Sequence, residues 1–218
     1  MSYLTTPEWQ NYLALMEQRP SDFFQSDTLR LLTDPDTVEQ FVRETGARPG
    51  VRYYSDYHIL VADLVEEPSG RRFVYERVLN TREEPAVVTV PVCDGRFALL
   101  RQFRHAMREG QLAFPRGYGE KGISSGDNAE KEIGEELGST VTARRFLGTA
   151  VADSGVLGAR IAFWQCDITP PQLKRGYEEI EDLLLVTREE LNAMIARGEI
   201  TDALTLAALQ MLDCTAQS

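Results

Sequence analysis

A glycine-rich loop that runs directly into a short acidic helix constrains this chain more than any other feature of its sequence. The stretch FPRGYGEKGISSG covers residues 114–126, and DNAEKEIGEELG follows it over residues 127–138. Ser124 is placed to cap the start of a helix, with Asp127 three positions later, and Gly138 is placed to end it. The sequence therefore predicts a helix with two defined ends, beside a loop that brings backbone groups and Arg116 close to it.

Three glutamates within the predicted helix lie on one side of it. Glu132, Glu135 and Glu136 are three and four residues apart, so their carboxylates project within one arc. Like charges at these spacings cost a few tenths of a kcal/mol per pair on an isolated helix, roughly. A divalent cation would turn this repulsion into binding, because Mg²⁺ prefers carboxylate oxygens. A solvated acidic face is the alternative, and the adjoining loop favours the metal site.

The charge balance limits the class of partner. A formal net charge of −11 argues against binding of a nucleic acid polymer, which requires Lys and Arg to neutralise phosphates. A phosphorylated substrate would need a divalent cation or a local group of arginines. We expect no signal peptide and no membrane span, since no apolar run reaches about 20 residues. The three cysteines fit no zinc or disulfide framework, so the expected compartment is the cytoplasm: Cys93, Cys166 and Cys214.

The rest of the chain predicts an α+β fold with a mixed sheet. Residues 1–50 are helical and irregular in pattern, and β-rich runs follow at 51–65, 71–79, 86–92 and 96–103. Asp94-Gly95 between two of these runs indicates a tight hairpin. Further strands are predicted at 144–152, 159–168 and 178–186, with helices at 188–198 and 201–213. Strands mixed with a few helices, without regular alternation, are typical of α+β proteins.

The loop and helix resemble the Nudix box, whose pattern is G-x5-E-x7-R-E-U-x-E-E-x-G-U with U aliphatic. Six positions match in register: Gly117, Glu132, Ile133, Glu135, Glu136 and Gly138. Three positions depart from the pattern, with Ile123 in place of Glu, Lys131 in place of Arg and Ser139 in place of an aliphatic residue. The departures concern the loop–helix scaffold rather than the metal-binding glutamates, and Glu120 is placed to substitute for the missing acid.

The resemblance extends from about residue 86 to residue 212. The segment LLRQFRHAMREGQLAFPRGYGE is similar to the strand-to-loop entry of ADP-ribose-pyrophosphatase-like Nudix proteins, except that Ala113 replaces their Glu. The closing pattern, Asp-x-x-Thr-Leu-Ala-Ala-Leu from residue 202, is similar to the last helix of that subgroup. The resemblance implies an α/β/α sandwich around a mixed sheet. We expect a helical segment at 1–50, a β-rich extension at 51–85 and a Nudix domain at 86–218.

The resemblance also implies roles for individual residues. Glu132 and Glu136 would bind Mg²⁺ or Mn²⁺ together with the carbonyl of Arg116, and Glu135 would be a further ligand or orient the attacking water. Substrate phosphates would be held by arginines, for which the candidates are Arg101, Arg104 and Arg116. An additional ligand or general base would come from an acidic loop, with the candidates Glu178, Glu179 and Glu181.

The implied function is hydrolysis of a phosphoanhydride in a nucleoside diphosphate linked to another moiety, such as ADP-ribose or a nucleotide sugar. A homodimer formed through the N-terminal strands is implied as well. Aromatic residues of that region are candidates for base stacking, although core packing is the simpler interpretation: Tyr53, Tyr54, Tyr57 and Phe73. His58 and His105 have no second ligand at metal spacing and are interpreted as structural. The alternative function is a catalytically weak Nudix-like nucleotide-binding sensor or interaction module, favoured by Ala113, Ile123 and Lys131.

Overall fold

The chain divides into two units, each with its own hydrophobic core. The computed structural model describes residues 2–216. One unit comprises the residues up to Thr81 together with the segment Asp153–Ala159, and the other comprises Arg82–Ala152 and the residues from Arg160 onward. The first unit therefore includes a short segment that lies between two strands of the second unit in the sequence.

The second unit is built on a mixed sheet. Its main strands follow the spatial order β11-β6-β5-β10-β9, with β7 paired to β6 and β8 paired to β5. β10 runs parallel to β5, whereas the other pairings described for this sheet are antiparallel. The strands are β5 (Ala86–Cys93), β6 (Arg96–Arg104), β7 (Glu109–Ala113), β8 (Arg116–Gly117), β9 (Val141–Ala150), β10 (Ile161–Ile168) and β11 (Ile180–Val186). The predicted mixed sheet and α+β class are confirmed.

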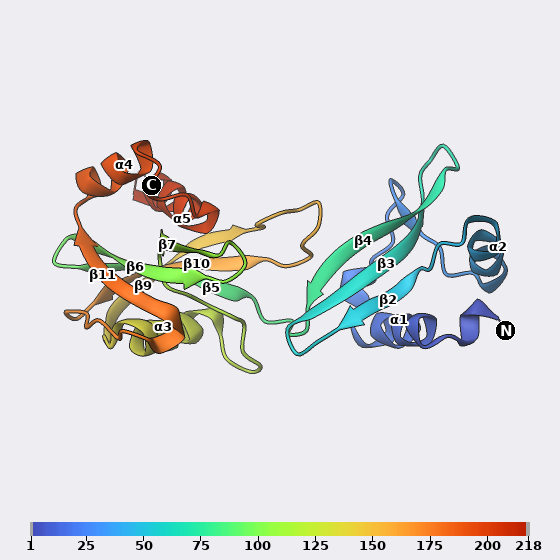
Figure 1. Ribbon diagram of the computed structural model, residues 1–218, viewed down its shortest axis with the longest axis horizontal. Helices are drawn as coiled ribbons and strands as arrows, with labels where there is room; N and C mark the ends of the chain where they lie inside the picture. Colours follow the sequence, from blue (N-terminus) through green and yellow to red (C-terminus); the bar gives the residue numbers. More distant parts are fainter. Residues whose placement is uncertain (1, 217–218) are drawn as a thin grey trace. The chain divides into compact units, whose positions relative to one another are not determined.

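Helices cover both faces of this sheet, as Figure 1 shows. α3 (Ser125–Leu137) packs one side of its helix on one face, and α4 (Arg188–Ala196) and α5 (Ala203–Ala216) pack on the other. Alternation along β6 sends Leu100 toward α3 and Leu99 toward α4 and α5. The predicted α/β/α sandwich is confirmed. None of the helices within residues 2–216 has the length and apolarity that crossing a membrane requires.

The first unit joins two helices to a small antiparallel sheet. β3 (His58–Glu66) is its central strand and pairs with the other three. The remaining elements are η1 (Tyr3–Thr5), α1 (Pro7–Gln18), η2 (Pro20–Phe23), β1 (Arg30–Leu31), α2 (Pro35–Thr45), β2 (Gly50–Tyr54) and β4 (Arg72–Asn80). β4 also contacts the inserted segment, where the Val78 N–H donates to the Val156 carbonyl at 2.8 Å.

The β-rich run at residues 51–65 forms two strands, because the chain turns between Tyr54 and His58. The Ser55 N–H donates to the His58 carbonyl at 2.9 Å, and the Ser55 hydroxyl accepts from the His58 N–H at 3.0 Å. A serine side chain that satisfies the backbone in this way stabilises a turn. The sequence does not indicate this turn, because tyrosines, which favour strands, surround it.

A buried charge links α1 to the sheet of the first unit. Asp63 on β3 is 2% exposed, and its carboxylate accepts from the Tyr12 hydroxyl at 2.7 Å and from Arg77 Nε at 2.6 Å. The Arg77 guanidinium also lies over the ring of Phe23. A buried carboxylate of this kind is tolerated because hydrogen bonds and a counter-charge surround it.

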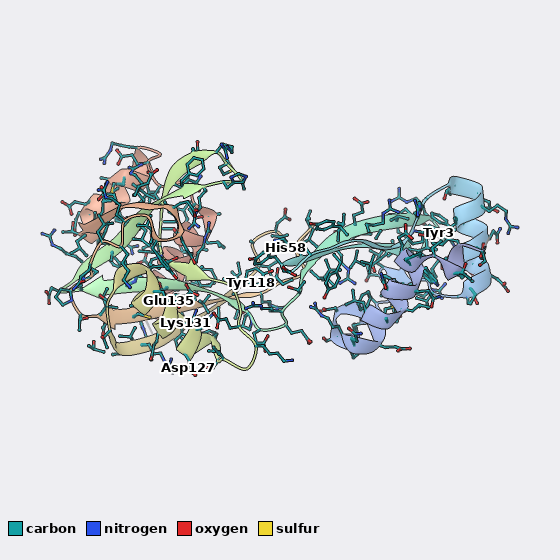
Figure 2. The ribbon with its side chains drawn as sticks, turned by 60° about the horizontal axis from the view of Figure 1, so that its bottom comes forward. Tyr3, His58, Tyr118, Asp127, Lys131 and Glu135 are labelled. Carbon is teal, nitrogen blue, oxygen red and sulfur yellow. The ribbon has the colours of Figure 1, made fainter. Side chains whose placement is uncertain are left out.

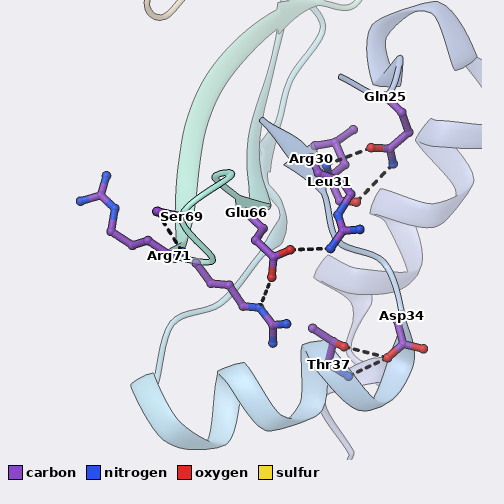
Figure 3. Close-up of polar contacts among 9 residues, drawn as sticks. Gln25, Arg30, Leu31, Asp34, Thr37, Glu66, Ser69 and Arg71 are labelled. Carbon is purple, nitrogen blue, oxygen red and sulfur yellow. Dashed lines mark hydrogen bonds and ion pairs between the residues drawn. The ribbon is translucent and has the colours of Figure 1, made fainter. Parts of the chain in front are cut away.

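A second charge cluster in the same unit lies at the surface. Figure 3 shows Glu66 of β3 bonded to Arg30. Glu66 also accepts a hydrogen bond from Arg72 Nε at 2.7 Å, and the neighbouring Glu67 accepts one from Arg71 Nη2 at 2.7 Å. The three arginine side chains are exposed to solvent. Ion pairs with such exposed partners contribute little to stability, because water and salt screen them.

Replacement of Asp63 by Ala should therefore destabilise the first unit far more than replacement of Glu66 by Ala. The first change leaves Tyr12 and Arg77 without their buried partner, which costs about 3 kcal/mol. Urea unfolding followed by Trp9 fluorescence in a Trp164→Phe background would measure this, since the chain has 2 tryptophans and Trp9 belongs to the first unit. Equal losses for the two variants would contradict the assigned role of Asp63.

Candidate active site

Helix α3 has the predicted ends. The Ser124 hydroxyl accepts a hydrogen bond from the Asp127 N–H at 3.2 Å, and Gly138 ends the helix with a φ of 59°. Ile133 and Leu137 are buried against the sheet. The helix is thus fixed at both ends and along one side, and the positions of its glutamates follow from that packing.

The glycine-rich loop lies directly against α3. A Cβ atom at Gly117 would meet Oε1 of Glu132 at 1.8 Å, so the Glu132 side chain occupies the space that any larger residue would take. The Asn128 side chain of the helix donates to the Tyr118 carbonyl at 2.8 Å. The backbone N–H of Gly122 donates to Glu84 at 3.0 Å. These contacts hold the loop where its backbone borders the carboxylates.

Glu132 and Glu136 are buried next to one another on α3. Glu132 is 7% exposed and Glu136 is 1% exposed. Burial raises the pKa of Glu132 to about 7 and that of Glu136 to about 8, and the charge on Glu178 contributes to both increases. Glu136 accepts a hydrogen bond from the backbone N–H of Arg116. Its Oε2 atom is buried and has no hydrogen-bond partner among the described residues.

Glu135 is oriented differently from the other two glutamates. Figure 2 shows it beside Lys131 on α3, and Lys131 Nζ lies 2.9 Å from Glu135 and 2.7 Å from Glu120. The expected substitution of Glu120 for the missing acid of the box is therefore present as an ion pair. Lys131 lies beside the acidic side of the helix and pairs with Glu135. Ser139, the third departure, is buried and donates to the Thr169 carbonyl at 2.7 Å.

Two arginines lie beside the buried glutamates. Burial lowers the pKa of Arg104, the nearby charge of Arg116 lowers it further, and Glu136, Asp202 and Glu178 oppose the shift. Arg104 Nε is buried without a hydrogen-bond partner in the part of the chain that the structure describes. The two arginines border a cavity of about 240 Å³ whose remaining lining is Ala86, Val87, Val88, Gly117, Tyr118, Ile161 and Leu204. An anionic group with an apolar attachment fits such a lining.

Glu178 is held in an unusual turn before β11. Glu178 and Glu179 have φ values of 43° and 59°, in the left-handed region that non-glycine residues seldom adopt. The side chain of the buried Gln102 donates to the Glu178 carbonyl at 2.5 Å. Strained backbone is retained where its surroundings fix it, and such residues are concentrated at functional sites. Of the three acidic candidates, Glu178 interacts electrostatically with both buried glutamates.

Two predicted site residues, and His105, which was interpreted as structural, lie away from this group. Arg101 is exposed and, by alternation along β6, is on the face opposite Arg104, where it interacts with Glu199. Glu181 is at a bulge in β11 and its side chain lies against Gly110. His105 pairs with Arg108 at 2.9 Å. The structure therefore does not bring Arg101, Glu181 or His105 together with the buried carboxylates.

Three residues of the site were not selected from the sequence. Asn128 and Gln102 are buried amides that the sequence alone does not mark as part of the site. Their role depends on the backbone carbonyls to which they donate, and these are set by the tertiary fold. Asp202 contacts Arg116 at 2.9 Å from the start of α5. Its signal was available, since Asp202 opens the Asp-x-x-Thr pattern of the closing helix.

The residues around Glu132 and Glu136 fit a divalent cation. Buried like charges and an unpartnered Oε2 of Glu136 are suited to an ion that prefers oxygen ligands. Within residues 2–216, no group of three or more His, Cys, Asp or Glu side chains is arranged so that it could hold a metal ion as it stands. The ion pair between Glu135 and Lys131 explains why a third carboxylate is missing from the group. Glu135 points to the Lys131 ammonium instead of to Glu132 and Glu136.

Comparison with known proteins gives one curated relative and a wider structural likeness. No family model matches the chain. It is 35% identical over 74 residues to the ADP compounds hydrolase NudE of Escherichia coli (strain K12), a match that covers 34% of this chain. The chain spans 39% of that relative's length in the match. Among solved structures, a crystal structure of an ADP compounds hydrolase superposes with a TM-score of 0.68 and 20% identity, covering 77% of this chain and 90% of the other. The structural likeness shows a shared fold.

Replacement of Glu136 by Gln should stabilise the protein when divalent metal is absent. In EDTA at about pH 9, the change removes one of two like charges that are buried together, and relief of such a charge is worth on the order of 1 kcal/mol or more. Thermal unfolding of the two proteins side by side measures the difference. A lower melting temperature for the variant would show that Glu136 is compensated inside the protein and has no need of an added cation.

Proposed function

We propose that this chain, which belongs to the Nudix hydrolase superfamily and resembles its ADP-ribose-pyrophosphatase-like members, is a metal-dependent hydrolase of nucleoside diphosphate derivatives. The bond cleaved is the phosphoanhydride between the two phosphates, as in ADP-ribose or a nucleotide sugar. The observation that supports this is the buried pair Glu132 and Glu136 beside Arg104 and Arg116. The curated relative is named for hydrolysis of ADP compounds, which points to the same substrate class.

The metal would be Mg²⁺ or Mn²⁺, held by Glu132 and Glu136. The backbone carbonyl of Arg116 is the proposed third ligand, since the Arg116 N–H already contacts Glu136. Glu135 would join the group on release from Lys131. When bound, the ion supplies charge neutralisation for the diphosphate and lowers the pKa of a bound water.

The arginines would position the diphosphate. Arg104 and Arg116 present guanidinium groups at the edge of the cavity, and guanidinium matches phosphate oxygens in paired hydrogen bonds. The apolar part of the lining, with Ile161 and Leu204, would accommodate the group attached to the phosphates. An acidic protein with a net charge of −11 needs such a local positive group to attract an anion.

Glu178 is the proposed acceptor for the proton of the attacking water. The charge of its carboxylate raises the pKa of both Glu132 and Glu136, and the Gln102 side chain holds its backbone carbonyl. Proton transfer to a positioned side chain contributes a factor of roughly 10² to 10⁴ in rate. Glu178 is preferred to Glu179, which shares the turn, because the charge of Glu178 raises the pKa of both buried glutamates.

The remaining parts of the proposal concern assembly and compartment. The resemblance implies a homodimer formed by the β-rich region of residues 51–85, where Tyr53 and Tyr54 are exposed on β2. Large exposed aromatic side chains are typical of interaction surfaces. Cys93 and Cys166 are buried free thiols, which fits a reducing compartment such as the cytoplasm.

A nucleotide sensor without turnover is the second candidate function. The observation that favours it is the ion pair between Lys131 and Glu135, which keeps one glutamate of the helix away from a metal. Ala113 also favours the sensor, because this buried residue replaces the Glu of the ADP-ribose-pyrophosphatase-like subgroup. A sensor would bind nucleotide with thermal stabilisation and release no product.

The proposal is tested by a panel of ADP-ribose, nucleotide sugars and dinucleotide diphosphates with Mg²⁺ and with Mn²⁺. Release of a nucleoside monophosphate is expected for at least one member, and EDTA should stop it. Glu136→Gln should reduce the rate by at least about a hundredfold, because the ion contributes several kcal/mol to the transition state. Ligand-dependent stabilisation without product would favour the sensor, and the absence of both would contradict the two functions together.

Replacement of Glu178 by Gln should lower kcat by about a hundredfold with little change in KM, because the proton acceptor acts on the chemical step. Glu181→Gln is the matched comparison, since that side chain lies against Gly110 and away from the buried pair. A larger loss for Glu181→Gln than for Glu178→Gln would reverse the assignment.

A further inference from the structure

Asp202, the residue before α5, uses its two carboxylate oxygens for different purposes. Oδ1 accepts hydrogen bonds from the Thr205 N–H and the Thr205 hydroxyl, both at 2.8 Å, as expected of a helix cap. Oδ2 accepts from Arg116 Nη1 at 2.9 Å. Oδ1 alone is sufficient to cap the helix. The contact of Oδ2 with Arg116 is therefore not required for capping.

Thr205 extends this connection to the loop that precedes the acidic helix. Its hydroxyl accepts a hydrogen bond from the Phe114 N–H at 3.0 Å, and the side chain is fully buried. The start of α5 is thereby bonded to the loop at Phe114 and again at Arg116, two residues later. We call Asp202, Thr205 and these two contacts the α5 latch.

The latch also solves an electrostatic problem. Arg104 and Arg116 are close enough for each charge to oppose the other, and Asp202 is a nearby counter-charge for both. The Asp202 side chain is 9% exposed, so water screens its interaction with Arg116 weakly. Without this carboxylate, the Arg116 guanidinium would be pushed away from Arg104 and from the cavity edge.

We infer that Asp202 is a positioning residue for substrate binding, which holds Arg116 beside Arg104 so that the two guanidinium groups together receive a diphosphate. This inference rests on the proposed function for its substrate class. Asp202 does not contact the substrate and acts through Arg116, while Thr205 fixes the loop that presents it. The closing Asp-x-x-Thr pattern of the sequence thus belongs to the anion site, although Asp202 lies 86 residues after Arg116 in the chain.

A double-mutant cycle on Asp202 and Arg116 tests this. Asp202→Asn keeps an oxygen for the helix cap and removes the charge that holds Arg116. We expect it to raise KM for the hydrolysed ADP compound about tenfold with kcat within about twofold, and to have no further effect in an Arg116→Gln background. Asp213→Asn is the matched control, because Asp213 pairs with Arg188 at the exposed side of the same helix, and its KM should not change.

The same double-mutant cycle can be measured without turnover, as the affinity for inorganic pyrophosphate determined by calorimetric titration in EDTA. If no ADP compound is hydrolysed, the proposed function fails, while the cycle in pyrophosphate affinity still decides the role of Asp202. Equal effects of Asp202→Asn in both backgrounds would overturn the inference, as would tighter binding by that variant or no binding of pyrophosphate by the unaltered protein. Should Asp202→Asn not fold, Thr205→Val takes its place with the same expected pattern.

Discussion

Two carboxylates of like charge, Glu132 and Glu136, are buried side by side on the inner side of one helix turn, and the surrounding structure keeps them there. Removing such groups from water is unfavourable, and placing them next to each other adds repulsion. The helix has no freedom to relieve this, because Ile133 and Leu137 anchor it to the sheet and Gly117 packs against Glu132. The arrangement has a physical explanation if a divalent cation supplies the missing charge.

The rest of the second unit brings positive charge to the same place, and Arg104 offsets only part of the charge of the pair. Arg104 reaches the site because alternation along β6 directs it to the face that α3 covers. Arg116 reaches it from the loop, and its charge is balanced by Asp202 rather than by the buried glutamates. Because Asp202 rather than a buried glutamate pairs with Arg116, the arginines remain available to an anion and the glutamates to a cation. A metal–diphosphate complex contains both.

Local features of the site were predictable from the sequence, whereas long-range contacts were not. The ends of α3 and the hairpin at Asp94-Gly95 follow from capping and turn rules that act over a few residues. The pairing of Lys131 with Glu120 spans 11 residues, and only the resemblance suggested a role for Glu120. The placement of Arg101 away from Arg104 was also accessible, because alternation along one strand would have separated them. The latch at Asp202, the bond from Gln102 to the turn of Glu178 and the inserted segment 153–159 depend on the tertiary fold.

The central claim is that the Glu132–Glu136 pair is a cation site, and anomalous diffraction from crystals soaked in Mn²⁺ tests it most directly. The account predicts an anomalous peak within bonding distance of carboxylate oxygens of both residues, roughly 2.2 Å away for an ion with oxygen ligands. Addition of a non-hydrolysable ADP-ribose analogue should retain the peak and place phosphate oxygens beside it. Density for the analogue at Arg104 and Arg116 with no peak between the two glutamates would contradict the account.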